Sequence, residues 1–272
     1  MPGLTPWPPN VSMTWTDSQQ LGSETARAGF RNEADVVDRF NAWQTDAMAQ
    51  AWLARMGYTV DEIEWVTAAK IPGSHKADVQ VQVTIQLTSV IGVENLQVKL
   101  VSQAAGFNQI DKRWVSTYTE LWQMPPTIET LFKRFTGEIE PTGETRDARR
   151  TFADEFTATE RDCLLAFLEQ NRTLIITDIL KGRGRFSAEW LLVILKHDGH
   201  ERWTLEPMNV VLNFFGHGPI EITARGSIRI GQITVQRKGG DNGRDSAKML
   251  QFKINPALLF EMRDPTGRPV GT

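Results

Sequence analysis

An acid, an amide and a lysine occur in the order that a metal-dependent phosphodiesterase requires. Asp78, Gln97 and Lys99 follow the pattern of an acid and then Asp/Glu-x-Lys, with glutamine in the place of the second acid. Carboxylate and amide oxygens suit Mg²⁺, and a lysine can orient a water that attacks phosphorus. Because glutamine carries no charge, we expect weaker Mg²⁺ binding than at a two-acid site unless another carboxylate joins. Glu33 is the candidate for that third metal ligand.

Two predicted strands position these side chains. Apolar residues fall on every second position over residues 78–85 and again over residues 96–100, which predicts two half-buried β-strands. Alternate side chains of a strand point to opposite faces, so Gln97 and Lys99 share one face. Asp78 opens its strand on the face opposite the valines. The same pattern would also fit the exposed polar faces of an ordinary hairpin.

The remaining pattern predicts an α/β protein with one domain over residues 23–262, an N-terminal extension over 1–22 and a tail over 263–272. We expect helices from Ser23, around Met48–Met56 and directly after the loop at 106–109. Thr157 and Glu160 form a capping-box pattern ahead of a further helix, and residues 207–215 predict a short one. Strands are expected over residues 174–180, 190–195, 220–223, 228–236 and 249–254.

Composition fits an intracellular enzyme. The chain has 272 residues and 40% hydrophobic content, enough for one large core. Its single cysteine, Cys163, precludes an internal disulfide, and no signal peptide or membrane-spanning run is evident. We therefore expect a cytoplasmic protein with no membrane partner. The four histidines lack ligand spacing, and residues 182–184 lack the Walker pattern, so zinc and nucleotide chemistry are not predicted.

A basic segment stands out against the net charge of −3. Residues 225–253 contain seven lysines and arginines against two aspartates, which is typical of a solvated face or of a nucleic-acid surface. Side chains within it could read base edges in the major groove, with glycines that let the backbone approach DNA. The alternative is a glycine-rich hairpin turn with charged shoulders. The candidates are Gln236, Arg237, Lys238, Asp241, Asn242 and Arg244.

Five stretches in the same order resemble the HinPI family of restriction endonucleases, which is related to MspI. They are residues 29–33, 95–102, 106–112, 177–184 and 236–244, and the similarity runs from about Leu21 to Phe260. The resemblance implies a restriction-endonuclease-like α/β core, with a mixed central sheet flanked by helices. It implies Mg²⁺-dependent type II cleavage of double-stranded DNA at GCGC, after the first G, with a 5′ overhang. Asp78, Gln97 and Lys99 match the family's active site, whereas Ala77 replaces the serine of its motif.

The resemblance also assigns DNA contacts beyond the basic segment. It implies that the loop with Phe107, Asn108 and Gln109 pushes side chains between base pairs and bends the DNA. Phe107 could instead fill the core, which is the commoner role of a phenylalanine. The further predicted phosphate contacts are Lys112, Lys181, Arg183 and Arg185.

Several alternatives stay open at the level of sequence. A repair or structure-specific nuclease could use the same core, and a non-catalytic DNA-binding protein could carry the same basic segment. Specificity could have drifted to a site such as CCGG. A palindromic site invites a two-fold dimer, yet the resemblance implies that one protomer can bind and nick, so a monomer and a homodimer are both compatible. A restriction system places the enzyme in a prokaryotic cell.

Overall fold

The computed structural model describes residues 33–71, 80–103, 105–197, 199–240 and 244–262. Three predicted site residues, Asp78, Asp241 and Asn242, lie outside these ranges. The predicted extension over residues 1–22 and the predicted tail over 263–272 also lie outside them. The domain boundaries therefore stay a prediction.

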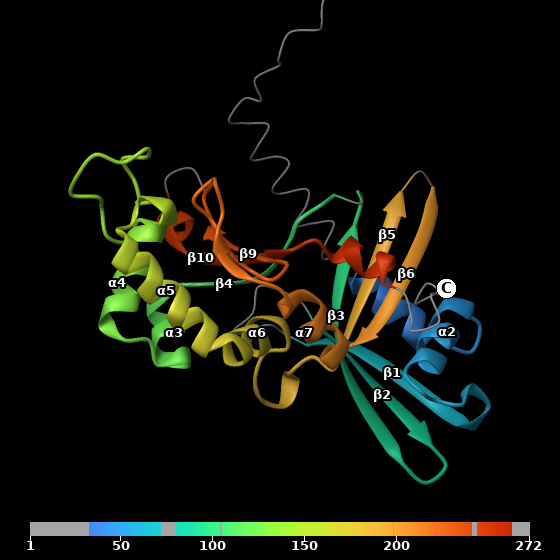
Figure 1. Ribbon diagram of the computed structural model, residues 1–272. Helices are drawn as coiled ribbons and strands as arrows, with labels where there is room; N and C mark the ends of the chain where they lie inside the picture. Colours follow the sequence, from blue (N-terminus) through green and yellow to red (C-terminus); the bar gives the residue numbers. More distant parts are fainter. Residues whose placement is uncertain (1–32, 72–79, 104, 198, 241–243, 263–272) are drawn as a thin grey trace, which may run out of the picture.

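Two five-stranded sheets organise the described chain (Figure 1). In the first sheet β3 and β5 run parallel and every other neighbouring pair is antiparallel, which confirms the predicted mixed sheet. Its strands, in spatial order, are β1 (Ile63–Ile71), β2 (Gln80–Leu87), β3 (Ile91–Val101), β5 (Trp190–His197) and β6 (His200–Pro207). The second sheet is antiparallel throughout. Its strands, in spatial order, are β4 (Asn108–Arg113), β10 (Leu250–Ile254), β9 (Ile233–Arg237), β8 (Ile228–Ile230) and β7 (Ile220–Ile222).

Helices cover both sheets. Figure 1 shows α3, α4 and α5 grouped on the side of the second sheet away from the first, with α6 and α7 near the junction of the two sheets. A helical segment spans residues 33–41. The other α-helices are α2 (Ala47–Arg55), α3 (Val115–Trp122), α4 (Pro126–Thr136), α5 (Ala158–Gln170), α6 (Arg172–Leu180) and α7 (Met208–Gly216). Short 3₁₀ helices are η1 (Val60–Glu62), η2 (Ala153–Glu155), η3 (Gly184–Phe186), η5 (Asp245–Lys248) and η6 (Pro256–Glu261).

Local signals in the sequence explain several helix ends. The Asp46 carboxylate accepts hydrogen bonds from two backbone N–H groups at the start of α2, and Gly57 follows that helix with a φ of 94°. Thr157 and Glu160 make the predicted capping box of α5, each side chain accepting from the other residue's backbone N–H. The short helix predicted over residues 207–215 is α7, whose last residue is Gly216.

Two predicted elements were wrong, and the single strand predicted over residues 228–236 is instead the antiparallel pair of β8 and β9. Residues 174–180 form the helix α6 rather than a strand, and α6 carries little amphipathic pattern because four of its apolar side chains are buried. The loop at 106–109 leads into the strand β4 rather than into a helix. Ile110 ends up in the same core as Tyr118 of α3, and that shared burial produced the helical spacing.

Two hydrophobic cores determine which faces remain polar. One core packs the helical segment 33–41 and α2, through Phe40 and Trp52, against one face of the first sheet. The other packs α3 to α7 against the second sheet and extends to Leu191 and Val193 on the opposite face of β5. The middle of β3 is therefore covered on both faces, so the predicted half-buried strand over residues 96–100 is in fact buried. The prediction of a half-buried strand is confirmed for β2 over residues 81–87.

Candidate active site and nucleic-acid interface

The predicted amide and lysine lie together on β3. Leu96 and Val98 point into the core beneath the helical segment 33–41, so the alternation of the strand directs Gln97 and Lys99 to the other face. Both are buried, with 1% and 5% of their surface exposed. Gln80, the first described residue of β2, pairs directly with Gln97. The alternative that Gln97 and Lys99 lie on the exposed polar face of a hairpin is therefore wrong.

The lysine is tied to the beginning of the second sheet. Its Nζ atom donates a hydrogen bond to the backbone oxygen of Gln109 on β4, at 2.9 Å. The neighbouring Asn108 donates from Nδ2 to the backbone oxygen of Leu100 on β3, at 3.1 Å. Two side-chain hydrogen bonds therefore join the end of β3 to the start of β4, one donated from each strand.

Phe107 lies in this connection, directly before β4. Its side chain is 59% exposed, so the alternative that it fills the core is wrong. An exposed phenylalanine is an apolar group available for contact with a partner. The predicted role as a DNA wedge needs an exposed side chain, and it stays a prediction.

Glu33, the predicted third ligand, has a described contact with β1. Its carboxylate is 3.7 Å from Nζ of Lys70 on β1. Lys70 comes two positions after Ala68, whose side chain belongs to the core beneath the N-terminal helical segment. Gln97 and Lys99 point to the opposite face of the sheet, so the described contacts do not bring Glu33 to them.

Asn95 is a site residue that the sequence did not single out. It is 6% exposed and shares the face of Gln97, two positions along β3. Its Nδ2 atom donates to the backbone oxygens of Arg185 and Ser187, at 3.1 and 3.3 Å, and its Oδ1 atom accepts from Gln82. These hydrogen bonds hold the loop that contains Arg185, a predicted phosphate contact, next to β3 and the predicted metal ligand Gln97. Because residues two apart on a strand share a face, the alternation of β3 could have indicated that Asn95 lies beside Gln97.

Arg183, another predicted phosphate contact, is an exposed arginine that pairs with the buried Asp178. Asp178 on α6 accepts from Arg113 and Arg183, at 2.9 and 2.8 Å, and from Trp122 Nε1 at 3.0 Å. Arg113 on β4 also pairs with the fully buried Asp111, at 2.7 Å. The loop that carries Arg183 and Arg185 follows Asp178 closely in the chain, because α6 ends at Leu180 and Lys181 is its C-cap residue. The cluster around Asp178 fastens β4 to α3 and α6.

A polar face of the second sheet gathers other predicted contacts. Gln109, Lys112 and Gln236 share this face with two residues that the sequence did not single out, Gln251 and Lys253 on β10. Gln251 pairs with Gln236 on one side and with Lys112 on the other, and Lys253 pairs with Gln109. Burial lowers the pKa of Lys253. The face combines amides and cations, the groups that read and neutralise DNA.

A β-bulge in β4 creates this face. Lys112 pairs with Gln251 and Gln109 pairs with Lys253, so three steps along β4 match two steps along β10. In a regular strand, residues three apart point to opposite faces. Ile110 is the extra residue, and it is fully buried. The bulge thus turns Gln109 to the polar side.

The remaining candidates of the basic segment differ from Gln236 in orientation or in exposure. Arg237 points to the face opposite Gln236 and donates from Nε to the backbone oxygen of Ala247, at 3.0 Å. Burial and the nearby Arg149 lower the pKa of Arg237. Lys238 follows β9 and is partly buried, whereas Arg244 is exposed. The structure therefore brings Gln236 and Gln109 to one face and does not bring Arg237 there.

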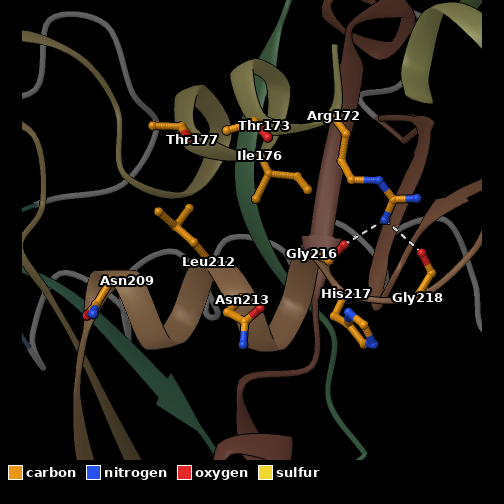
Figure 2. A pocket seen from close by; sticks show the side chains of 10 residues that line it. All are labelled: Arg172, Thr173, Ile176, Thr177, Asn209, Leu212, Asn213, Gly216, His217 and Gly218. Atoms are coloured by element: carbon orange, nitrogen blue, oxygen red, sulfur yellow. Dashed lines mark hydrogen bonds between the residues drawn. The ribbon is translucent and has the colours of Figure 1, made fainter. Parts of the chain in front are cut away.

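A separate pocket of about 670 Å³ lies between α6 and α7 (Figure 2). Arg172 closes one end by donating to the backbone oxygens of Gly216 and Gly218. The helices approach closely there, because a Cβ at Gly216 would lie 2.6 Å from a carbon of Ile176. None of its lining residues is a predicted site residue.

The donor set fits a hard cation. Gln97 offers an amide oxygen, and Asp78, two positions before Gln80 in the sequence, offers a carboxylate. Oxygen donors of this kind suit Mg²⁺ and not zinc, which prefers nitrogen and sulfur. Within the described residues no three His, Cys, Asp or Glu side chains gather into a cluster that could hold a metal.

The fold is that of a restriction endonuclease. It is similar to the solved structure of the restriction endonuclease MspI in complex with its cognate DNA, with a TM-score of 0.59 and 18% sequence identity. The match covers 86% of this chain and 92% of that chain. No curated protein sequence matches the chain. Over the described ranges, none of the helices has the length and apolarity needed to cross a bilayer.

The family follows from the sequence. The model of the R.HinP1I restriction endonuclease family matches residues 56–260, well over half of the chain, so the chain belongs to that family. It is therefore a type II restriction endonuclease that acts on DNA. The family favours this activity over the repair nuclease and the non-catalytic DNA-binding protein. Enzymes of this class generally use divalent metal ions.

Proposed function

We propose that the enzyme hydrolyses double-stranded DNA at GCGC, after the first G of each strand, and leaves a 5′ overhang. The observation that carries the mechanism is the joint placement of Gln97 and Lys99, buried on one face of β3. The specificity rests on the resemblance in sequence, with support from the amides and cations of the second sheet. We place this activity in the prokaryotic cytoplasm, where a restriction enzyme meets incoming DNA.

Asp78 and the Gln97 side-chain oxygen would hold Mg²⁺ against the scissile phosphate. When bound, the cation would neutralise charge that builds on phosphorus. The position of Glu33 beside Lys70 gives no support to its predicted role as a third ligand. With one carboxylate and one amide, the site would bind Mg²⁺ more weakly than a two-acid site does.

Lys99 would orient the attacking water. One of the three donors of its ammonium group goes to the backbone oxygen of Gln109, which fixes the direction of Nζ. The water oxygen bonds to phosphorus while the bond to O3′ breaks, so the products are a 5′-phosphate and a 3′-hydroxyl. Burial of Lys99 limits access of other water to the reacting atoms.

Contacts with DNA would come from both sides of the active lysine. Phe107 would enter the base stack from the connection between the sheets. Gln109 and Gln236 would face base edges, and Lys112, Lys238 and Arg244 would meet phosphates or guanines. Asp241 and Asn242 stay predicted contacts of the same segment.

The test is cleavage of a plasmid of known sequence with purified enzyme and Mg²⁺, followed by sequencing of the ends. We expect cuts confined to GCGC with 5′ overhangs. Lys99→Met, which keeps the apolar stem, should lose cleavage and retain DNA binding. Lys196→Ala is the matched control, because this lysine of the same sheet pairs with Asp35 and Glu201 instead.

Two results would contradict the proposal. Breaks at scattered or CCGG sequences would overturn the specificity, and full cleavage by Lys99→Met would overturn the mechanism. Sedimentation of the enzyme on a GCGC duplex separates a monomer from a homodimer.

A further inference from the structure

Three glutamines from three neighbouring strands form a chain of side-chain hydrogen bonds. Gln236 on β9 donates from Nε2 to Oε1 of Gln251 on β10, at 3.3 Å. Gln251 in turn donates from Nε2 to Oε1 of Gln109 on β4, at 2.6 Å. All three lie on the polar face of the second sheet. The chain therefore crosses the face from strand to strand.

The two hydrogen bonds run in the same direction. Gln251 accepts with one atom of its amide and donates with the other, so its orientation determines that of both neighbours. This direction engages Oε1 of Gln109 and leaves its Nε2 as the donor end of the chain. At the opposite end, Gln236 keeps Oε1 as an acceptor. Reversing one amide would require reversing all three.

The chain also reaches the active lysine. The backbone oxygen of Gln109 accepts from Nζ of Lys99, and its side chain accepts from Gln251. Gln109 thus joins β3 of the first sheet to the polar face of the second. A change in how Gln236 is held can pass through two hydrogen bonds to the residue that orients Lys99.

We infer that Gln251 is a positioning residue for sequence discrimination. It is 6% exposed, so its effect on DNA would come through Gln236 and Gln109 rather than through wide contact of its own. Cytosine presents an N4 amino donor in the major groove, which needs an acceptor such as Oε1 of Gln236. By fixing the direction of the chain, Gln251 favours cytosine at the position that Gln236 meets. The inference rests on the proposed function, because it takes this face as the DNA-reading surface.

Two substitutions separate its two hydrogen bonds. Gln251→Leu removes both, so we expect the ratio of kcat/KM for the cognate site over single-base variants to fall at least about fivefold. Gln251→Glu can accept from Gln236 and cannot donate to Gln109. We expect this variant to keep discrimination within about twofold and to lose kcat through Gln109 and Lys99.

The matched control is Gln232→Leu, which removes a hydrogen bond from Nε2 to the backbone oxygen of Phe214 next to the same sheet. It should lower the midpoint of thermal unfolding and leave discrimination unchanged. The discrimination ratio is measured within one preparation, so partial unfolding of a variant does not affect it.

An unchanged ratio in Gln251→Leu, with only a lower unfolding midpoint, would show a purely structural role and overturn the inference. Equal loss of discrimination in Gln251→Glu and Gln251→Leu would overturn the assigned direction of the chain. The wild-type enzyme is assayed first. If it cuts another sequence, the proposed specificity fails, and the variants are then compared on that sequence.

Discussion

Lys99 and Gln109 belong to different sheets, yet Nζ of the lysine donates to the backbone oxygen of the glutamine at 2.9 Å. Ten residues separate them in the chain, and the connection between them carries the exposed Phe107. The group that would orient the attacking water is therefore held by the strand that begins the surface proposed to face DNA. Movement of that strand on DNA binding would move the lysine.

Phe107→Ala should reduce cleavage without reducing stability. The side chain is 59% exposed, so its removal should change the free energy of unfolding by no more than about 0.5 kcal/mol. Loss of stacking against bases should lower kcat/KM about tenfold or more. Ile91→Ala, at a similarly exposed apolar residue, serves as the control in steady-state cleavage assays. Equal activity of the two variants would contradict insertion into DNA.

Asp78→Asn and Glu33→Gln should differ in their requirement for Mg²⁺. We expect Asp78→Asn to lose cleavage at all Mg²⁺ concentrations tested, because it removes the only carboxylate proposed as a ligand. Glu33→Gln should keep a half-maximal Mg²⁺ concentration within about twofold, since its carboxylate pairs with Lys70. Cleavage rates across a Mg²⁺ titration measure both. A tenfold higher requirement in Glu33→Gln would restore its predicted role as a ligand.

Asp178→Ala should be strongly destabilising. It removes the acceptor of Arg113 and Trp122 in a nearly fully buried position, which leaves one N–H group of each without that partner, while Arg113 keeps its ion pair with Asp111. The expected loss is about 2–4 kcal/mol in the free energy of unfolding, measured by urea titration. Asp245→Ala, at an exposed carboxylate, should cost less than about 0.5 kcal/mol. Similar midpoints for the two variants would refute the importance of the cluster.

Glu160→Gln should lower stability in a pH-dependent manner. Burial raises the pKa of Glu160, but the Thr157 N–H and Arg134 outweigh it and bring the pKa below the ordinary value of 4.5. A carboxyl whose pKa is lowered by folding stabilises the protein above its unfolded pKa and loses that contribution as pH falls through the folded pKa. The difference from wild type should thus be full above pH 4.5, at about 0.5–1 kcal/mol, and should vanish in stronger acid. Urea titrations at pH 7 and at pH 3 measure it, and a constant difference would contradict the pKa shift.

Local signals predicted the elements that carry their own pattern. Alternation indicated β2 and the middle of β3, and Thr157 with Glu160 indicated α5, because a cap or an alternating pattern lies within a short stretch of sequence. β1 escaped notice in part because its register shifts between Ile63 and Trp65, which breaks the alternation. The apolar run of α6 is buried on several sides and so carries no helical period.

The site was predictable only where its residues share a strand. Gln97 and Lys99 lie two positions apart, so the period of β3 places them together. Gln251 is an ordinary glutamine in the sequence, and its position depends on pairing with strands far away in the chain. The face reached by Gln109 depends on a bulge, and strand pattern alone does not predict where a bulge falls.

Because of the bulge at Ile110, a buried side chain determines which residues of β4 lie on the polar face. In a regular ladder continued from Lys112, Ile110 would take the position opposite Lys253, and Gln109 would turn toward the core. Burial of the isoleucine keeps the strand in the other register. A search for altered specificity that varies only solvent-facing residues would overlook this position, whereas a polar residue at 110 could change the recognised sequence without touching a base.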